Sequence, residues 1–159
     1  MDYAKKCYLC VADSYTYLNP NTGIHPLAKL LRDGGGDYGN LSTIFISLLR
    51  CSGIPSRHLV AKRPDGTNHV WTDFYLQDYG WVPVDVSKRN ANKYGDFFGR
   101  IDSRDTGIII SKGVNLTVDI QSGKKYDTNI LQNFYYWYRY SSRAGEVIVD
   151  FRYVTKPLN

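Results

Sequence analysis

The chain has 159 residues, of which 43% are hydrophobic and 22% are charged. That length suffices for one domain with a buried core, and the composition excludes a low-complexity or disordered chain. We therefore expect a single domain over residues 1–159. The net charge is +5, but the basic residues are scattered in isolated pairs such as Lys5-Lys6 and Lys124-Lys125. Without a basic stripe, no nucleic-acid partner is expected.

No apolar stretch is long enough to cross a bilayer, so membrane insertion is not expected. The N-terminus lacks the basic-then-apolar pattern of a signal peptide. The compartment and the oligomeric state therefore stay open. One interpretation kept open is that the chain is an extracytoplasmic piece excised from a longer protein.

The three cysteines are Cys7, Cys10 and Cys51. An odd number does not describe a disulfide framework. Cys7 and Cys10 fall three residues apart in a predicted helix with no thioredoxin-like unit around them, so we interpret them as two buried thiols on one helix face. Four metal ligands cannot be assembled around them by any obvious spacing, and no metal or other cofactor is expected.

Helices are predicted in the first third of the chain, over residues 2–18 and 26–31 and, as the central element, over about 38–51. The central helix has the clearest periodicity, with apolar residues at i, i+3, i+4, i+7 and i+8: Leu41, Ile44, Phe45, Leu48 and Leu49. Gly53 ends it, and Pro55 prevents its continuation.

Strands are predicted over residues 57–61, 69–76, 81–86, 108–110, 114–120, 134–140 and 146–154. Helices first and antiparallel strands later predict an α+β fold with a single core. Residues 134–140 read Phe-Tyr-Tyr-Trp-Tyr-Arg-Tyr and place rings on both faces of their strand. Packing in a sheet is the favoured interpretation, and a carbohydrate-binding surface is the alternative.

Tyr38 lies at the N-terminus of the central helix, where unpaired backbone N–H groups and the helix dipole favour negative charge. A cysteine at such a position has its pKa lowered and its thiolate stabilised. A phenol, with an ordinary pKa of about 10, supplies little anion at neutral pH. The position therefore suits an anion that Tyr38 does not readily provide.

His69 begins an alternating strand, and Asp85 follows apolar strand residues, where a carboxylate needs a partner. His69 is the candidate partner. A regular hairpin that paired Leu76 with Trp81 would set Asp85 opposite Thr72, on the wrong face for His69. A bulge or a tighter turn is needed for the two side chains to meet.

Several motifs follow one another in a specific order: Gly-Asp-Tyr-Gly-Asn at 36–40, Leu-Leu-Arg at 48–50, Gly-Ile-Pro-Ser-Arg at 53–57, His-Val-Trp at 69–71 and Gly-Trp-Val-Pro-Val-Asp at 80–85. This order resembles the transglutaminase-like branch of the papain-type cysteine enzymes, and the resemblance spans residues 24–87. It implies N-terminal helices packed on a mainly antiparallel sheet.

In that family the helix opens on a nucleophilic cysteine, and a histidine and an aspartate follow on neighbouring strands. The resemblance places Tyr38 at the nucleophile position, as an inactive substitute, and gives the other two roles to His69 and Asp85. Four flanking residues are taken as binding candidates: Trp71, Trp81, Asp37 and Asn40.

The function predicted from this resemblance is a catalytically impaired domain that binds a protein or peptide ligand or acts as a scaffold. One alternative is a working hydrolase of the amidase or peptidase type, in which His69 and Asp85 activate water. A second alternative, a carbohydrate-binding surface module, depends only on the aromatic run of residues 134–140.

Overall fold

The structure is a computed structural model that describes residues 1–18, 25–63, 65–91, 95–102, 108–112, 116–120 and 124–128. Side chains are described only in the ranges up to residue 102, and there not for residue 91. The predicted strands over 134–140 and 146–154, and with them the aromatic run, lie outside the described residues.

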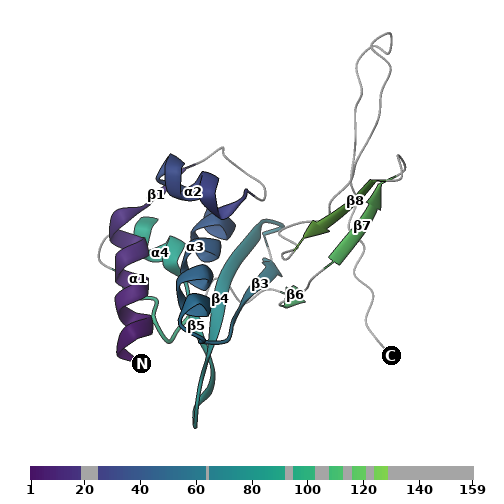
Figure 1. The fold of residues 1–159 in the computed structure, drawn as a ribbon. Coiled ribbons are helices and arrows are strands. Elements are labelled where there is room, and N and C mark those ends of the chain that lie inside the picture. The colour runs from purple at the N-terminus through teal and green to yellow at the C-terminus, as the bar shows by residue number, and fades with distance from the viewer. Residues whose placement is uncertain are drawn as a thin grey trace, which may run out of the picture.

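The fold is α+β, as predicted from the sequence (Figure 1). Its helices are α1 (Asp2–Ser14), α2 (Leu27–Asp33), α3 (Tyr38–Cys51) and α4 (Val86–Ala91). The main sheet has the strand order β5-β4-β3-β6, with every neighbouring pair antiparallel: β5 (Gly80–Val84), β4 (Asn68–Leu76), β3 (Ser56–Lys62) and β6 (Ile108–Lys112). Two further pairs are the parallel β1 (Thr16–Tyr17) with β2 (Gly35–Gly36), and the antiparallel β7 (Leu116–Ile120) with β8 (Lys124–Thr128).

Helix α3 is the central element, and it packs between α1 and α4 on one side and strands β3 and β4 on the other. The predicted apolar stripe is confirmed, since Leu41, Ile44, Phe45 and Leu49 are buried and Leu48 is partly buried. The stripe shares one core cluster with sheet residues Phe74 and Val84 and with α1. Burial of a side chain such as Phe45 stabilises the fold by about 2–3 kcal/mol.

Helix α1 differs from its prediction in length and in orientation. It ends at Ser14 rather than at residue 18, because the chain becomes extended at Tyr15 and then pairs as β1. Its buried face consists of Ala4, Cys7, Tyr8, Val11 and Ala12. The prediction of two buried thiols is therefore wrong for Cys10, which is exposed, and holds for Cys7.

The pairing of β1 with β2 brings the end of α1 beside the start of α3. This approach requires a glycine at position 35, where φ is +151° and a Cβ would lie 1.9 Å from the carbonyl oxygen of Thr16. The adjacent Gly36 would likewise bring a Cβ within 2.5 Å of the Cβ of Asn40. The glycine-rich approach to α3 is therefore a site of close backbone packing.

The β4–β5 hairpin is tighter than the regular hairpin considered from the sequence. Leu76 pairs with Gly80 and Thr72 pairs with Val84, so the strands are displaced by one residue. The predicted strand over 81–86 is also too long, because β5 ends at Val84 and α4 begins at Val86. Asp85 thus lies at the junction of a strand and a helix.

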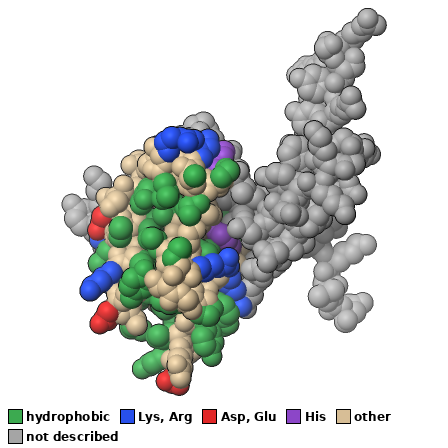
Figure 2. All heavy atoms as spheres, viewed as in Figure 1, with side chains coloured by type: hydrophobic (Ala, Val, Ile, Leu, Met, Phe, Trp, Pro, Cys, Tyr) green, Lys and Arg blue, Asp and Glu red, His purple; other side chains and the backbone are tan. Residues whose placement is uncertain are grey.

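Lys and Arg side chains on the face drawn in Figure 2 occupy separate places and do not form one patch. Among the described helices, none has the length and apolar character needed to span a bilayer.

Candidate functional site

Tyr38 is the first residue of α3, and Asp37 precedes it as the N-cap, accepting a hydrogen bond from the Asn40 amide at 2.9 Å. The Tyr38 ring is partly buried and packs against Val60 of β3 and Val70 of β4. Burial raises the pKa of Tyr38, and the neighbouring Asp37 carboxylate raises that pKa further. The side chain at the helix N-terminus is therefore a neutral phenol at physiological pH.

His69 and Asp85 form a buried pair in which His69 Nε2 lies 2.6 Å from Asp85 Oδ2. Their side chains are only 5% and 1% exposed. The predicted contact between them is confirmed, and it depends on the tighter register of the β4–β5 hairpin. Because β5 ends at Val84 and α4 begins at Val86, Asp85 lies just beyond the strand, at the start of the helix.

The second oxygen of Asp85 is held by the first turn of α4. Oδ1 accepts hydrogen bonds from Ser87 Oγ at 2.7 Å and from the Lys88 amide at 2.9 Å. These contacts make Asp85 the N-cap of α4 and fix its carboxylate. We assign the Nε2 proton of His69 to the bond with Asp85, which makes Nδ1 the basic nitrogen of the ring.

The rings of Tyr38 and His69 are in direct contact. Their centroids are 5.5 Å apart with an interplanar angle of 69°, which is an edge-to-face arrangement. At this separation no further group fits between the two rings. An oriented imidazole–carboxylate pair therefore faces a phenol ring.

The structure brings some of the binding candidates to this pair and separates others from it. Trp71 is buried, and its ring lies 6.1 Å from that of His69. Trp81 pairs with Tyr75, six residues along β4 from His69, which corresponds to about 20 Å. There Trp81 is 41% exposed and is covered on one face by the Arg57 guanidinium at 3.5 Å.

Asp37 and Asn40 are nearly fully buried, at 2% and 1% exposed. The Asp37 side chain bonds to the backbone of Asn40, and Asn40 lies against Gly36. Both residues therefore shape the start of α3. Any contact of theirs with a ligand would involve only a small part of their surface.

Two supports of the site escaped the sequence reasoning. The N-cap role of Asp85, whose carboxylate accepts hydrogen bonds from Ser87 and Lys88, has a sequence signal, since Asp is a preferred N-cap residue. His58 has no such signal. It is buried on β3 with Nε2 3.2 Å from Thr43 Oγ1, and that hydroxyl donates to the Gly39 carbonyl at 2.9 Å.

Burial lowers the pKa of His58 to about 3, with the nearby Arg50 charge as a second cause. The ring is therefore neutral at physiological pH. Through Thr43 it supports the first turn of α3, next to Tyr38. Its role in the fold is structural.

A separate cavity of about 520 Å³ lies between the end of α1, β1 and α4, and is lined by Ala12, Asp13, Tyr15, Thr16, Arg89 and Asn90. Its lining includes neither Tyr38 nor His69. Within the part of the chain described here, no three His, Cys, Asp or Glu side chains gather as a metal site.

Comparisons with known proteins give a family and a fold. The model of the transglutaminase-like superfamily matches residues 1–86. LapG of Legionella pneumophila in its calcium-bound form superposes with a TM-score of 0.51 at 17% identity, over 70% of this chain and 63% of that chain. EGTA-treated LapG gives 0.52 at 16% identity, over 80% of this chain and 71% of that chain.

A protein of Cytophaga hutchinsonii, named as a candidate cysteine protease, matches 79% of this chain at 16% identity with a TM-score of 0.48. The present chain spans only 42% of that protein. No curated protein matches the sequence. The likeness to LapG concerns the fold, and the family match covers more than half of the sequence. This chain belongs to the transglutaminase-like superfamily.

Proposed function

We propose that this chain is a transglutaminase-like domain without thiol-based acyl transfer that serves as a protein- or peptide-binding module. The observation that carries the proposal is the edge-to-face contact between Tyr38 and His69. In this proposal Tyr38 takes the nucleophile position of the family, and its ring fills the space in which an acyl group would react.

Tyr38 is poorly suited to nucleophilic attack. Its raised pKa keeps the hydroxyl protonated, and its oxygen lies several bonds further from the backbone than a cysteine sulfur would. None of the three cysteines replaces it. Cys7 is buried in α1, Cys10 is exposed on the same helix, and Cys51 ends α3 about 20 Å from Tyr38.

The kind of ligand is argued from the family resemblance and the site together. Family members act on peptide amides, so their groove accommodates an extended chain. In this protein the same region presents a partly buried aromatic ring at Tyr38 beside His69. A tyrosine ring suits peptide contacts, since it offers apolar area and a polar tip.

The test is binding of the chain to an immobilised library of extended peptides. We expect Tyr38→Phe to retain binding and Tyr38→Ala to weaken it by about 10-fold or more, since the ring rather than the hydroxyl supplies contact area. Tyr79→Ala is the matched control, because Tyr79 is 79% exposed at the β4–β5 turn. Equal losses in all variants, or no binding by the native chain, would count against the proposal.

A working hydrolase is the second candidate, and the buried His69–Asp85 pair is the observation in its favour. In that case His69 would take a proton from water, and Asp85 would hold the ring. Amidase and peptidase assays decide between the two. Turnover that His69→Ala abolishes and Tyr38→Phe preserves would replace the binding proposal with this one.

A further inference from the structure

The segment that follows α4 runs beside the end of β5. The Asp85 amide donates to the Phe97 carbonyl at 3.0 Å, and an isolated antiparallel bridge joins Val84 to Phe98. The Gly99 amide adds a bond of 2.8 Å to the strand. The backbone of Asp85 is therefore held by this neighbouring segment, and its carboxylate is held by α4.

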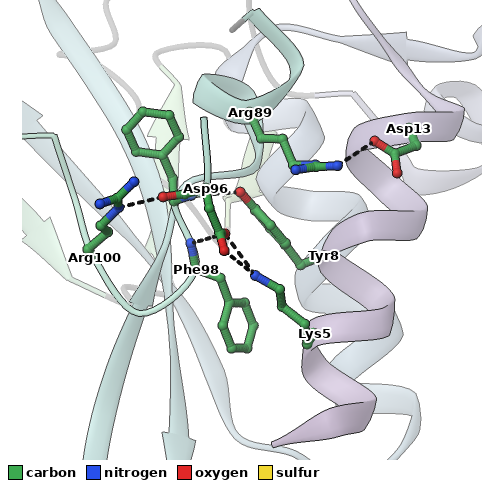
Figure 3. Close-up of polar contacts among 8 residues, drawn as sticks. Lys5, Tyr8, Asp13, Arg89, Asp96, Phe98 and Arg100 are labelled. Carbon is green, nitrogen blue, oxygen red and sulfur yellow. Dashed lines mark hydrogen bonds and ion pairs between the residues drawn. The ribbon is translucent and has the colours of Figure 1, made fainter. Parts of the chain in front are cut away.

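Helix α1 fixes the same segment from the other side (Figure 3). Tyr8 Oη accepts a hydrogen bond of 2.8 Å from the Phe97 amide. Lys5 Nζ contacts both carboxylate oxygens of Asp96, at 2.8 and 2.7 Å. The same ammonium lies 5.0 Å from the ring centroid of Tyr8 and 4.8 Å from that of Phe98. Two adjacent residues of the segment are thus tied to one helix.

A continuous series of hydrogen bonds results. It runs from Tyr8 Oη to the Phe97 amide, from the Phe97 carbonyl to the Asp85 amide, and from Asp85 Oδ2 to His69 Nε2. We propose that Tyr8 and Lys5 are positioning residues for the Asp85–His69 pair, acting through the backbone of Phe97. This inference goes beyond the proposed function and holds whether the site binds or catalyses.

Tyr8 is suited to this role because it is fully buried and its hydroxyl stays protonated. Burial raises the pKa of Tyr8 to about 12. Without the hydroxyl, the partly buried Phe97 amide would lose its acceptor, and the segment would shift to find another. Phe97 cannot shift alone, since its carbonyl is bonded to Asp85.

Lys5 mainly orients Asp96, and its ion pair adds little to stability. Its side chain is 33% exposed and that of Asp96 is 55% exposed, so the ion pair is screened by solvent. The two rings that flank the ammonium limit where it can lie, and Arg100 Nε bonds to the Asp96 carbonyl from the opposite side. Asp96 is therefore held at one orientation at the start of the segment.

The first test follows the NMR signal of the proton on His69 Nε2 in the otherwise native chain. We expect Tyr8→Phe and Lys5→Gln to speed exchange of that proton with solvent by about 5- to 10-fold, because the Asp85 contact opens more often. Tyr3→Phe and Lys6→Gln are matched controls, since both residues are exposed on the same helix. Lys5→Arg, which keeps the charge, should restore slow exchange.

The second test separates positioning from packing by a double-mutant cycle with Asp85→Asn. If Tyr8 acts through Asp85, Tyr8→Phe should not change the His69 ring signals further once Asp85→Asn has weakened the contact. Additive changes in the two variants would overturn the proposal. So would a Tyr8→Phe variant whose unfolding free energy falls while the His69 proton exchanges as in the native chain.

If Tyr8→Phe does not fold, Lys5→Gln and Asp96→Asn decide the question, since they remove partly exposed groups only. Native exchange rates in both of these folded variants would overturn the proposal. These readouts do not involve peptide binding. If the native chain binds no peptide but the His69 proton responds to the variants as expected, the binding proposal fails and this inference stands. If peptides bind but the His69 proton does not respond, this inference alone fails.

Discussion

The ring of Tyr38 meets the imidazole of His69 edge-on, with 5.5 Å between the centroids. Tyr38 comes from the first turn of α3, and His69 from the start of β4, beyond the point where β5 ends. The contact therefore closes the junction between the helix and the sheet.

The first prediction concerns Tyr38→Cys. The helix N-terminus and the adjacent His69 should stabilise the introduced thiolate, so its pKa should fall well below the ordinary value of about 8.5. Alkylation by iodoacetamide between about pH 6 and 7 should be about 10-fold faster than that of the exposed Cys51.

His69→Ala in the same background should slow this reaction, because it removes the imidazole that lies beside the thiol. An introduced thiol that titrates like an ordinary cysteine and ignores the loss of His69 would show that position 38 is not an anion site.

The second prediction concerns Asp85→Ala. The change removes the N-cap of α4 and leaves the buried His69 and Ser87 without their acceptor. The free energy of unfolding should fall by about 2–4 kcal/mol, as measured by urea denaturation. Asp2→Ala, at an exposed position of α1, should change it by no more than about 0.5 kcal/mol. A loss of similar size in both variants would contradict the structural role assigned to Asp85.

The third prediction concerns pH. The ordinary histidine pKa is 6.5, whereas burial lowers that of His58 to about 3 in the folded protein. The unfolded chain therefore binds one more proton between these values, and stability should fall as the pH drops through this range. His58→Gln should reduce the slope of stability against pH by up to about 1.4 kcal/mol per unit. Urea titrations at several pH values measure it, and equal slopes would rule out a buried neutral His58.

The fourth prediction concerns the close approach of β1 and β2. Gly35→Ala would place a Cβ 1.9 Å from the Thr16 carbonyl oxygen, so the pair must separate. We expect a loss of about 2 kcal/mol or more in unfolding free energy. Gly53→Ala is the control, with φ of +73° and open space around the Cβ, and should cost about 1 kcal/mol. If the two substitutions lower the free energy of unfolding equally, the close approach of β1 and β2 does not exclude a side chain at Gly35.

The fifth prediction concerns the native thiols. Burial raises the pKa of Cys7, so Cys7 should alkylate more slowly than the exposed Cys10 and Cys51. Peptide binding should survive alkylation of the two exposed thiols, since neither lies at the start of α3. Any amidase activity that is lost on alkylation of Cys10, in protein that stays folded, would assign chemistry to the N-terminal pair. Mass spectrometry of the labelled peptides identifies which thiol has reacted.

The sequence by itself determined the central helix. Helix α3 spans residues 38–51 as predicted, because its signals are local: a 3.6-residue apolar repeat, and Gly53 with Pro55 after it. Strands β3 and β4 were located to within a residue or so for the same reason. Tyr38 at the start of α3 also follows from sequence alone.

The tertiary structure decided the features that depend on distant parts of the chain. The buried face of α1 is set by α3 and α4, and it turned Cys10 outward against the prediction. The hairpin register differs by one residue, a choice that local propensity does not settle, yet it determines whether His69 meets Asp85. The tie of Lys5 to Asp96 joins residues 91 positions apart. Such contacts form only because the packed core fixes both ends at once, and no local pattern encodes that constraint.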